Sequence, residues 1–91
     1  MTSEVTATRL KRLQYRASHR GTKEMDWLLG RFAEARLDGM GASEIDLFEA
    51  LVALPDPDVQ AWILSPSLPV DPAYAAIIAE LRRFHGLSSD R

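Results

Sequence analysis

The sequence predicts an all-α protein, a small five-helix bundle, and three observations support this prediction. No stretch of the 91 residues alternates apolar and polar side chains with a period of two, as a half-buried strand would. Apolar residues instead recur at the i, i+3, i+4 spacing of a helix, and prolines fall only between these segments. A chain of this length with 46% hydrophobic residues fits one domain.

The first two expected helices are joined at a glycine. Residues 8–19 are expected to form a short basic helix, and Gly21 is expected to end it as a left-handed cap with positive φ. The second helix is expected over residues 22–37. The apolar stripe of the first helix comprises Leu10, Leu13 and Ala17, and that of the second comprises Met25, Leu28, Leu29 and Phe32.

Three further helices are expected, each with its own start signal. Ser43 is the expected N-cap of the third helix. Asp56 and Asp71 each place a capping carboxylate before a proline, which starts the fourth and fifth helices, and Gly86 closes the fifth. The residues expected to face inward are Ile45, Phe48, Leu51 and Val52, then Val59, Trp62 and Ile63, then Tyr74, Ile77, Ile78 and Leu81.

The two ends of the chain lack a pattern that would order them. One helical domain is therefore expected over residues 9–86, with a flexible N-terminal tail at residues 1–8 and a flexible C-terminal tail at residues 87–91. Residues 1–8 have neither the apolar segment of a secretory signal nor the arginines of a transit peptide. No apolar run approaches the roughly 20 residues of a membrane span. We expect a bacterial cytoplasmic protein, without direct membrane insertion and monomeric when free.

Charge is distributed unevenly along the chain. Six of the eleven Lys and Arg residues lie between Arg9 and Lys23, with no acid among them. Between Glu24 and Glu80 there are eleven acids and two basic residues, although the net charge of the whole chain is only −2. Three interpretations of the basic segment stay open: phosphate contacts to a nucleic acid, docking onto an acidic protein surface, or a solvated helix face. The acidic body argues against the first.

Sequence motifs of catalysis and cofactor binding are not found. The absence of cysteine excludes disulfides, thiolate zinc sites and a cysteine nucleophile, and neither a GxGxxG nor a GxxxxGK[ST] segment occurs. His19 and His85 have no ligand-spaced partner and are expected to be surface or capping residues. Trp62 is expected in the core, whereas Trp27 lies off the apolar stripe and is expected to be partly exposed. We expect no enzyme, no metal and no cofactor bound by this chain.

The joint between the first two helices, Arg20-Gly21-Thr22-Lys23-Glu24, carries more charge than a turn requires. Capping can explain the charges. The negative charge of Glu24 in the first turn of the second helix complements the helix dipole, as does the positive charge of Arg20 at the end of the first helix. Each such charge stabilises its helix by about 0.3–1 kcal/mol. The residue types alone do not reject this explanation.

The same five residues resemble the RGxxE signature of the small succinate dehydrogenase assembly factors, the bacterial SdhE type and its mitochondrial relatives. The resemblance covers about Arg9 to Phe84. It includes Tyr15-Arg16-Ala17-Ser18, Glu24-Met25-Asp26 with Leu28 and Leu29, Phe32-Ala33-Glu34, Leu51 and Leu54, Asp56-Pro57-Asp58, Val59 and Trp62. His19 departs from the second basic residue that many relatives carry.

The resemblance implies a five-helix bundle and a non-enzymatic assembly factor. Such factors bind the flavoprotein subunit of succinate dehydrogenase, and in some bacteria that of fumarate reductase, and promote covalent attachment of FAD to a histidine of that subunit. FAD would then belong to the partner, and the charges of Arg20 and Glu24 would face outward toward it. The partner-binding residues implied in this way are Arg20, Gly21 and Glu24, with Arg16, Tyr15 and Asp26 as neighbours. A nucleic-acid-binding module or an inhibitor of another protein is the alternative.

Overall fold

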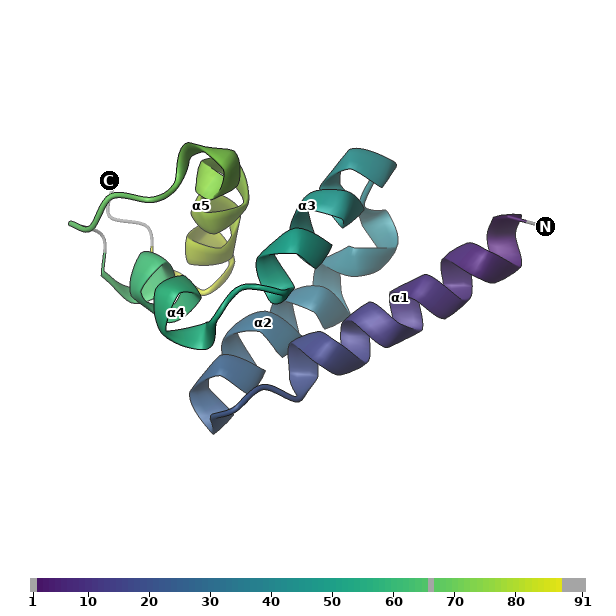
Figure 1. Cartoon of the computed structure of the whole chain (residues 1–91), viewed down its shortest axis with the longest axis horizontal. Coiled ribbons are helices and arrows are strands. Elements are labelled where there is room, and N and C mark those ends of the chain that lie inside the picture. Colours follow the sequence, from purple (N-terminus) through teal and green to yellow (C-terminus); the bar gives the residue numbers. More distant parts are fainter. Residues whose placement is uncertain (1, 66, 88–91) are drawn as a thin grey trace.

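The computed structural model of the chain describes residues 2–65 and 67–87, and it confirms the expected all-α fold (Figure 1). These residues form five α-helices and two short 3₁₀ helices. The α-helices are α1 (Thr2–Ser18), α2 (Lys23–Arg36), α3 (Ala42–Val52), α4 (Asp56–Leu64) and α5 (Ala75–Phe84), and the 3₁₀ helices are η1 (Leu37–Gly39) and η2 (Pro72–Tyr74). None of the helices in this part of the chain is both long and apolar enough to cross a bilayer.

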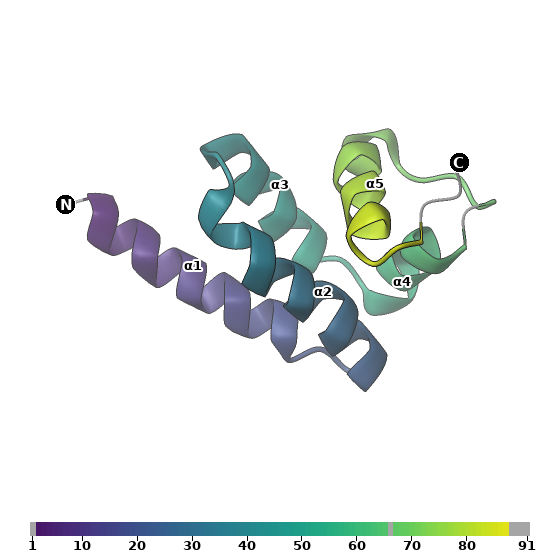
Figure 2. The same cartoon turned by 180° about the vertical axis from the view of Figure 1, so that it is seen from behind.

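The helices form two groups that meet at α2. α1 runs antiparallel beside α2, and α3 packs against α1 (Figures 1 and 2). α4 and α5 pack on each other, and α5 also packs on α2. The N-terminal turns of α1 extend beyond the bundle, which agrees with overall dimensions of 44 × 25 × 21 Å.

The core contains most of the residues of the apolar stripes that the sequence predicts, whereas Leu10, Trp62 and Tyr74 of these stripes are only partly buried. Its centre is a cluster of rings: Phe32 lies 5.7 Å from Phe48 and 5.5 Å, edge to face, from Phe84. Trp62 and Tyr74 are only half-buried and stack on each other at the edge of the core, with ring centroids 5.8 Å apart. The buried residues are Leu13, Ala17, Met25, Leu28, Leu29, Phe32, Ala33, Leu37, Ile45, Phe48, Leu51, Val52, Val59, Ile63, Ile77, Ile78 and Leu81.

α1 begins earlier than the sequence predicts. It starts at Thr2 rather than near residue 8, so residues 2–8 are helical where a flexible tail was expected. Met1 lies outside the described residues. Residues 2–8 contain neither glycine nor proline, and once a helix is nucleated each further residue adds one hydrogen bond, so the helix continues to Thr2.

The end of α5 follows the prediction. Gly86 has a φ of 71° and closes the helix in the left-handed region. Leu87 is tied back to Arg82, because its N–H donates to the Arg82 carbonyl at 2.7 Å and Arg82 Nη2 donates to its own carbonyl at 3.1 Å. The expected tail at residues 87–91 is thus anchored at Leu87, and residues 88–91 lie outside the described part.

Two of the start signals have different outcomes. Asp71 is a capping residue as predicted, since its Oδ1 accepts the N–H of Ala73 at 2.9 Å. The segment that it caps is η2, however, and α5 begins only at Ala75. The prediction that Ser43 is the N-cap of α3 is wrong, because Gly41 occupies that position. Glu44 Oε1 accepts the Gly41 N–H at 2.9 Å, so the capping group lies inside the helix and α3 begins before Ser43.

Candidate partner-binding site at the first helix joint

The joint between α1 and α2 is closed by hydrogen bonds from α2. Thr22 is the N-cap of α2, and its Oγ1 accepts the backbone N–H of Met25 at 3.2 Å. The half-buried carboxylate of Asp26 accepts the backbone N–H of Arg20. Asp26, expected as a neighbour of the interface, therefore folds the joint back onto the first turns of α2.

Gly21 is not the left-handed cap that the sequence predicts. Among the described residues, Gly86 is the one glycine with positive φ. The N–H of Gly21 donates to Asp56 Oδ2 at 3.2 Å, and the preceding N–H is satisfied by Asp26, so the hydrogen bonds of a left-handed cap are not needed. A Cβ on Gly21 would lie 3.5 Å from Asp56 Oδ2, an ordinary van der Waals distance. The glycine is exposed and leaves its backbone accessible.

The Arg20 side chain is turned into the fold, which corrects the expectation that its charge faces outward. Its Nε and Nη2 donate to Asp56 Oδ1 at 2.9 and 2.5 Å. Nη1 donates to the carbonyl of Val52 at 2.7 Å, and Nη2 also donates to that of Leu54 at 3.3 Å. Only 11% of the side chain is exposed. Arg20 therefore joins the first joint to the turn between α3 and α4.

Asp56 is the acceptor that the sequence pattern did not identify. An aspartate before a proline predicts an N-cap, but the N-cap of α4 is Pro55 and Asp56 is the first helical residue. Its carboxylate accepts from both Arg20 and Gly21. Arg20 and Asp56 are 36 positions apart in the sequence. An aspartate before a proline is equally consistent with capping a helix, so the sequence does not distinguish a capping Asp56 from one that pairs with Arg20.

Glu24 is exposed in the first turn of α2, where the helix dipole favours a carboxylate. Its Oε1 accepts from Nε2 of Gln60, on α4, at 3.0 Å. Arg20 and Gly21 reach α4 through Asp56, and Glu24 reaches it through Gln60. The joint thus places all three signature residues against α4, while Gly21 and Glu24 remain exposed.

Tyr15 and Arg16 lie on the last turn of α1, next to the joint. Tyr15 is 62% exposed, and its ring stacks on His19 with centroids 3.9 Å apart and planes 18° apart. Nδ1 of His19 lies 2.9 Å from the Tyr15 carbonyl. Arg16 is exposed. The structure therefore places these two expected residues at the surface on the last turn of α1.

The basic segment is partly neutralised within the fold. Nη2 of Arg9 lies 2.7 Å from Asp46 Oδ1 and 2.6 Å from Glu49 Oε1, and these hydrogen bonds raise the pKa of Arg9 above its usual value. Arg20 is paired with Asp56. The cations of this segment that are exposed and have no ion pair within residues 7–65 and 67–87 are Lys11, Arg12, Arg16 and Lys23.

His85 and Trp27 form a second contact between helices. Nε2 of His85 lies 2.8 Å from the Leu28 carbonyl, and its ring centroid lies 4.5 Å from that of Trp27. Trp27 is 49% exposed, as predicted. His85 thus links the C-terminal end of α5 to α2. No group of three or more His, Asp or Glu residues that could hold a metal occurs in the described part of the chain.

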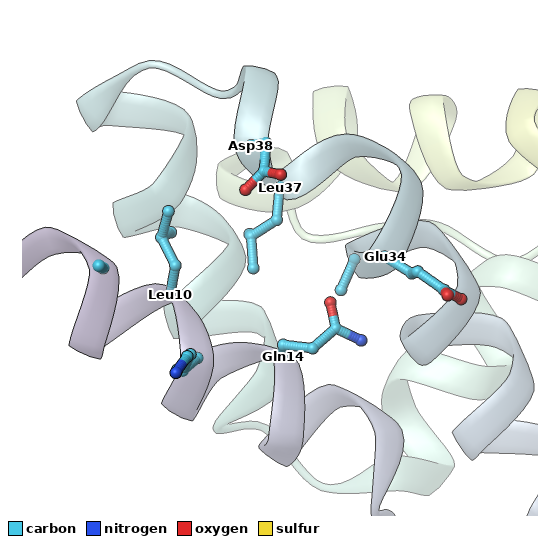
Figure 3. Close-up of a pocket in the computed structure, with 8 residues that line it drawn as sticks. Leu10, Gln14, Glu34, Leu37 and Asp38 are labelled. Atoms are coloured by element: carbon cyan, nitrogen blue, oxygen red, sulfur yellow. The ribbon is translucent and has the colours of Figure 1, made fainter.

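A shallow groove of about 540 Å³ lies away from the joint, between α1 and the C-terminal end of α2 with η1 (Figure 3). Leu10 and Leu37 line its inner side. Its polar groups come from Lys11, Gln14, Glu34 and Asp38, one cation, one amide and two carboxylates.

Comparison with known proteins adds an independent result. A family model described as the flavinator of succinate dehydrogenase matches residues 11–85. The chain is 46% identical over 57 residues to the FAD assembly factor SdhE of Acetobacter pasteurianus, which covers 63% of this chain and 52% of that protein. No solved structure matches.

Mitochondrial proteins are also similar. The chain is 39% identical over 61 residues to succinate dehydrogenase assembly factor 2 of Meyerozyma guilliermondii, covering 67% of this chain and 45% of the relative. It is 39% identical over 62 residues to the protein of the same name in Dictyostelium discoideum, covering 68% and 43%. The chain spans about half the length of the curated relatives it matches.

Proposed function

The chain belongs to the family of flavinators of succinate dehydrogenase, and on this premise we propose that it binds the flavoprotein subunit of succinate dehydrogenase and promotes its covalent flavinylation. The flavoprotein of fumarate reductase is a further candidate partner. We assign the protein to the bacterial cytoplasm, in line with its likeness to a bacterial FAD assembly factor. The nucleic-acid alternative is not favoured by this family membership.

The observation that supports this proposal is the exposed joint. Gly21 and Glu24 lie at its surface, and each is hydrogen-bonded to a side chain of α4. Gly21 is fixed by Asp56, and Glu24 by Gln60, so neither position has to be ordered when the partner arrives. Gly21 has no side chain to keep the partner backbone away, and Glu24 offers a carboxylate for charge-assisted hydrogen bonds.

FAD belongs to the partner in this proposal, and the chain acts by orientation rather than as an enzyme. The factor holds the flavoprotein so that its histidine and the flavin 8-methyl carbon are aligned. Well-oriented groups reach effective molarities of about 10⁵ M or more, so positioning alone accounts for a large rate gain. No bond-making step is assigned to a residue of this chain.

The test is reconstitution of the flavoprotein subunit with FAD, with and without this protein, followed by in-gel flavin fluorescence. Gly21→Arg and Glu24→Ala are expected to lower covalent flavin by about fivefold or more, since interface anchors commonly exceed 1 kcal/mol. Glu34→Ala, an exposed glutamate of the same helix, and Gly39→Arg, in open space, are the matched controls. If the controls lose as much as the joint variants, the joint is not the contact surface.

A further inference from the structure

We infer that Arg20 is a positioning residue, which clamps α4 to the first joint and does not itself touch the partner. The inference rests on the proposed function, because it explains how the same surface is held. It assigns Arg20 a different role from Gly21 and Glu24, although the three belong to one signature.

The clamp joins the ends of two helices. Val52, whose carbonyl accepts from Arg20 at 2.7 Å, is the last residue of α3, and Asp56 is the first residue of α4. A cation is favourable at the C-terminal end of a helix, and here it also binds the acid that begins the next helix. The planar guanidinium donates from Nε, Nη1 and Nη2 to Val52, Leu54 and Asp56. A lysine ammonium, whose three donors share one nitrogen, does not reproduce this fork.

The clamp also determines where the exposed signature residues lie. Asp56 and Gln60 are four residues apart and so lie on one face of α4, the face turned toward the joint. Asp56 holds the Gly21 N–H, and Gln60 holds the Glu24 carboxylate. Loosening the bond between Arg20 and Asp56 therefore shifts both contacts that fix the exposed surface.

Direct contact of Arg20 with a partner is disfavoured by its surroundings. With 11% of its side chain exposed, the guanidinium would have to leave Asp56, whose side chain is only 23% exposed. Removing one member of a largely desolvated ion pair leaves the other uncompensated, which is costly. Gly21 and Glu24 are reached without any such rearrangement.

A double-mutant cycle on Arg20 and Asp56 tests the inference. Arg20→Lys, Asp56→Asn and the double variant are titrated with the flavoprotein subunit by calorimetry, at a temperature where circular dichroism gives unchanged helix content. Each single variant is expected to weaken binding by about fivefold or more, and the double variant no more than the worse single one. Asp58→Asn, which removes an exposed acid of the same helical turn, is expected to bind like the parent.

Three results would overturn the inference. If Arg20→Lys weakens binding while Asp56→Asn behaves like Asp58→Asn, Arg20 contacts the partner. If the losses multiply in the double variant, the two residues act independently. If the folded variants bind like the parent, the clamp serves stability alone.

Hydrogen exchange of the Gly21 amide in the free protein separates failure of the clamp from failure of the proposed function. Arg20→Lys and Asp56→Asn are both expected to accelerate this exchange by about fivefold or more, whether or not the flavoprotein binds. Unchanged exchange in both variants overturns the clamp. An unmodified protein that fails to bind the flavoprotein overturns the proposed function instead.

Discussion

Gly30 of α2 and Ser18 of α1 lie at a close contact between the two helices. A Cβ on Gly30 would lie 2.9 Å from Ser18 Oγ and 3.1 Å from Ser18 Cα, both shorter than ordinary contacts. The hydroxyl can rotate, but the Cα cannot. Gln14 covers the same point, with Nε2 donating to Ser18 Oγ at 3.0 Å and to the Gly30 carbonyl at 3.4 Å. Helix packing therefore disfavours any side chain at this position in the middle of α2.

Gly30→Ala is expected to destabilise the protein by about 1–2 kcal/mol. Overpacking costs about 1–3 kcal/mol, and the better helix propensity of alanine returns up to about 1 kcal/mol. Urea unfolding followed by circular dichroism measures the difference. Gly39→Ala is the control, because a Cβ there meets nothing within 4 Å. A stabilised Gly30→Ala variant would show that the helices separate without cost.

Gly21→Ala and Gly86→Ala are expected to differ in stability. Gly21 lacks positive φ and has room for a Cβ, so its variant should stay within about 0.5 kcal/mol of the parent. Gly86 has a φ of 71°, where a Cβ costs about 1–2 kcal/mol. Thermal unfolding of the two variants side by side checks this. Equal losses would contradict the backbone assigned to Gly21.

Arg9→Gln is expected to lower Tm slightly at low salt. The difference in Tm should shrink near 1 M salt, because the Debye length there is only about 3 Å and exposed ion pairs are screened. Pairing with Asp46 and Glu49 raises the pKa of Arg9, so its contribution is present throughout the neutral range and is lost only in strongly alkaline solution. Arg12→Gln is the control, since Arg12 is exposed and unpaired within residues 7–65 and 67–87. A salt-independent loss would contradict an electrostatic origin.

His85→Ala is expected to cost about 1 kcal/mol, because the hydrogen bond between the imidazole and the Leu28 carbonyl is lost. Trp27 should also become more exposed and shift its fluorescence to the red, which is best measured in a Trp62→Phe background. His19→Ala, at the exposed end of α1, should leave both stability and this emission unchanged. Unaltered Trp27 emission in His85→Ala would contradict the contact between the imidazole and the indole ring.

The sequence predicts the helices and their buried faces because both depend on periodicity. Phe32 and Phe48 are both buried as expected, because each lies on the apolar stripe of its helix. Helix starts were predicted less well where the capping group lies inside the helix, as Glu44 does for α3. The prediction of Asp71 succeeded because its hydrogen bond is local, to a residue two positions away.

The joint could be located from the sequence, but its internal contacts could not. Arg20 is compatible with capping, with partner binding and with an intramolecular ion pair, and only the approach of Asp56 distinguishes them. Gly30 gave no signal because its need for glycine arises from Ser18 on another helix. Such contacts are tertiary, and a local pattern does not encode them.

The bond between Arg20 and Asp56 has a consequence for protein engineering. In a chimaera, residues 19–26 would come from one relative and the α3–α4 turn from another. The donor at position 20 and its acceptors in that turn would then come from different proteins, and their hydrogen-bond geometry would not be matched. The transplantable unit is therefore made of two separate pieces of chain. Grafting the five-residue signature alone onto a foreign helical hairpin would transfer its residues without the contacts from the α3–α4 turn that hold them in place.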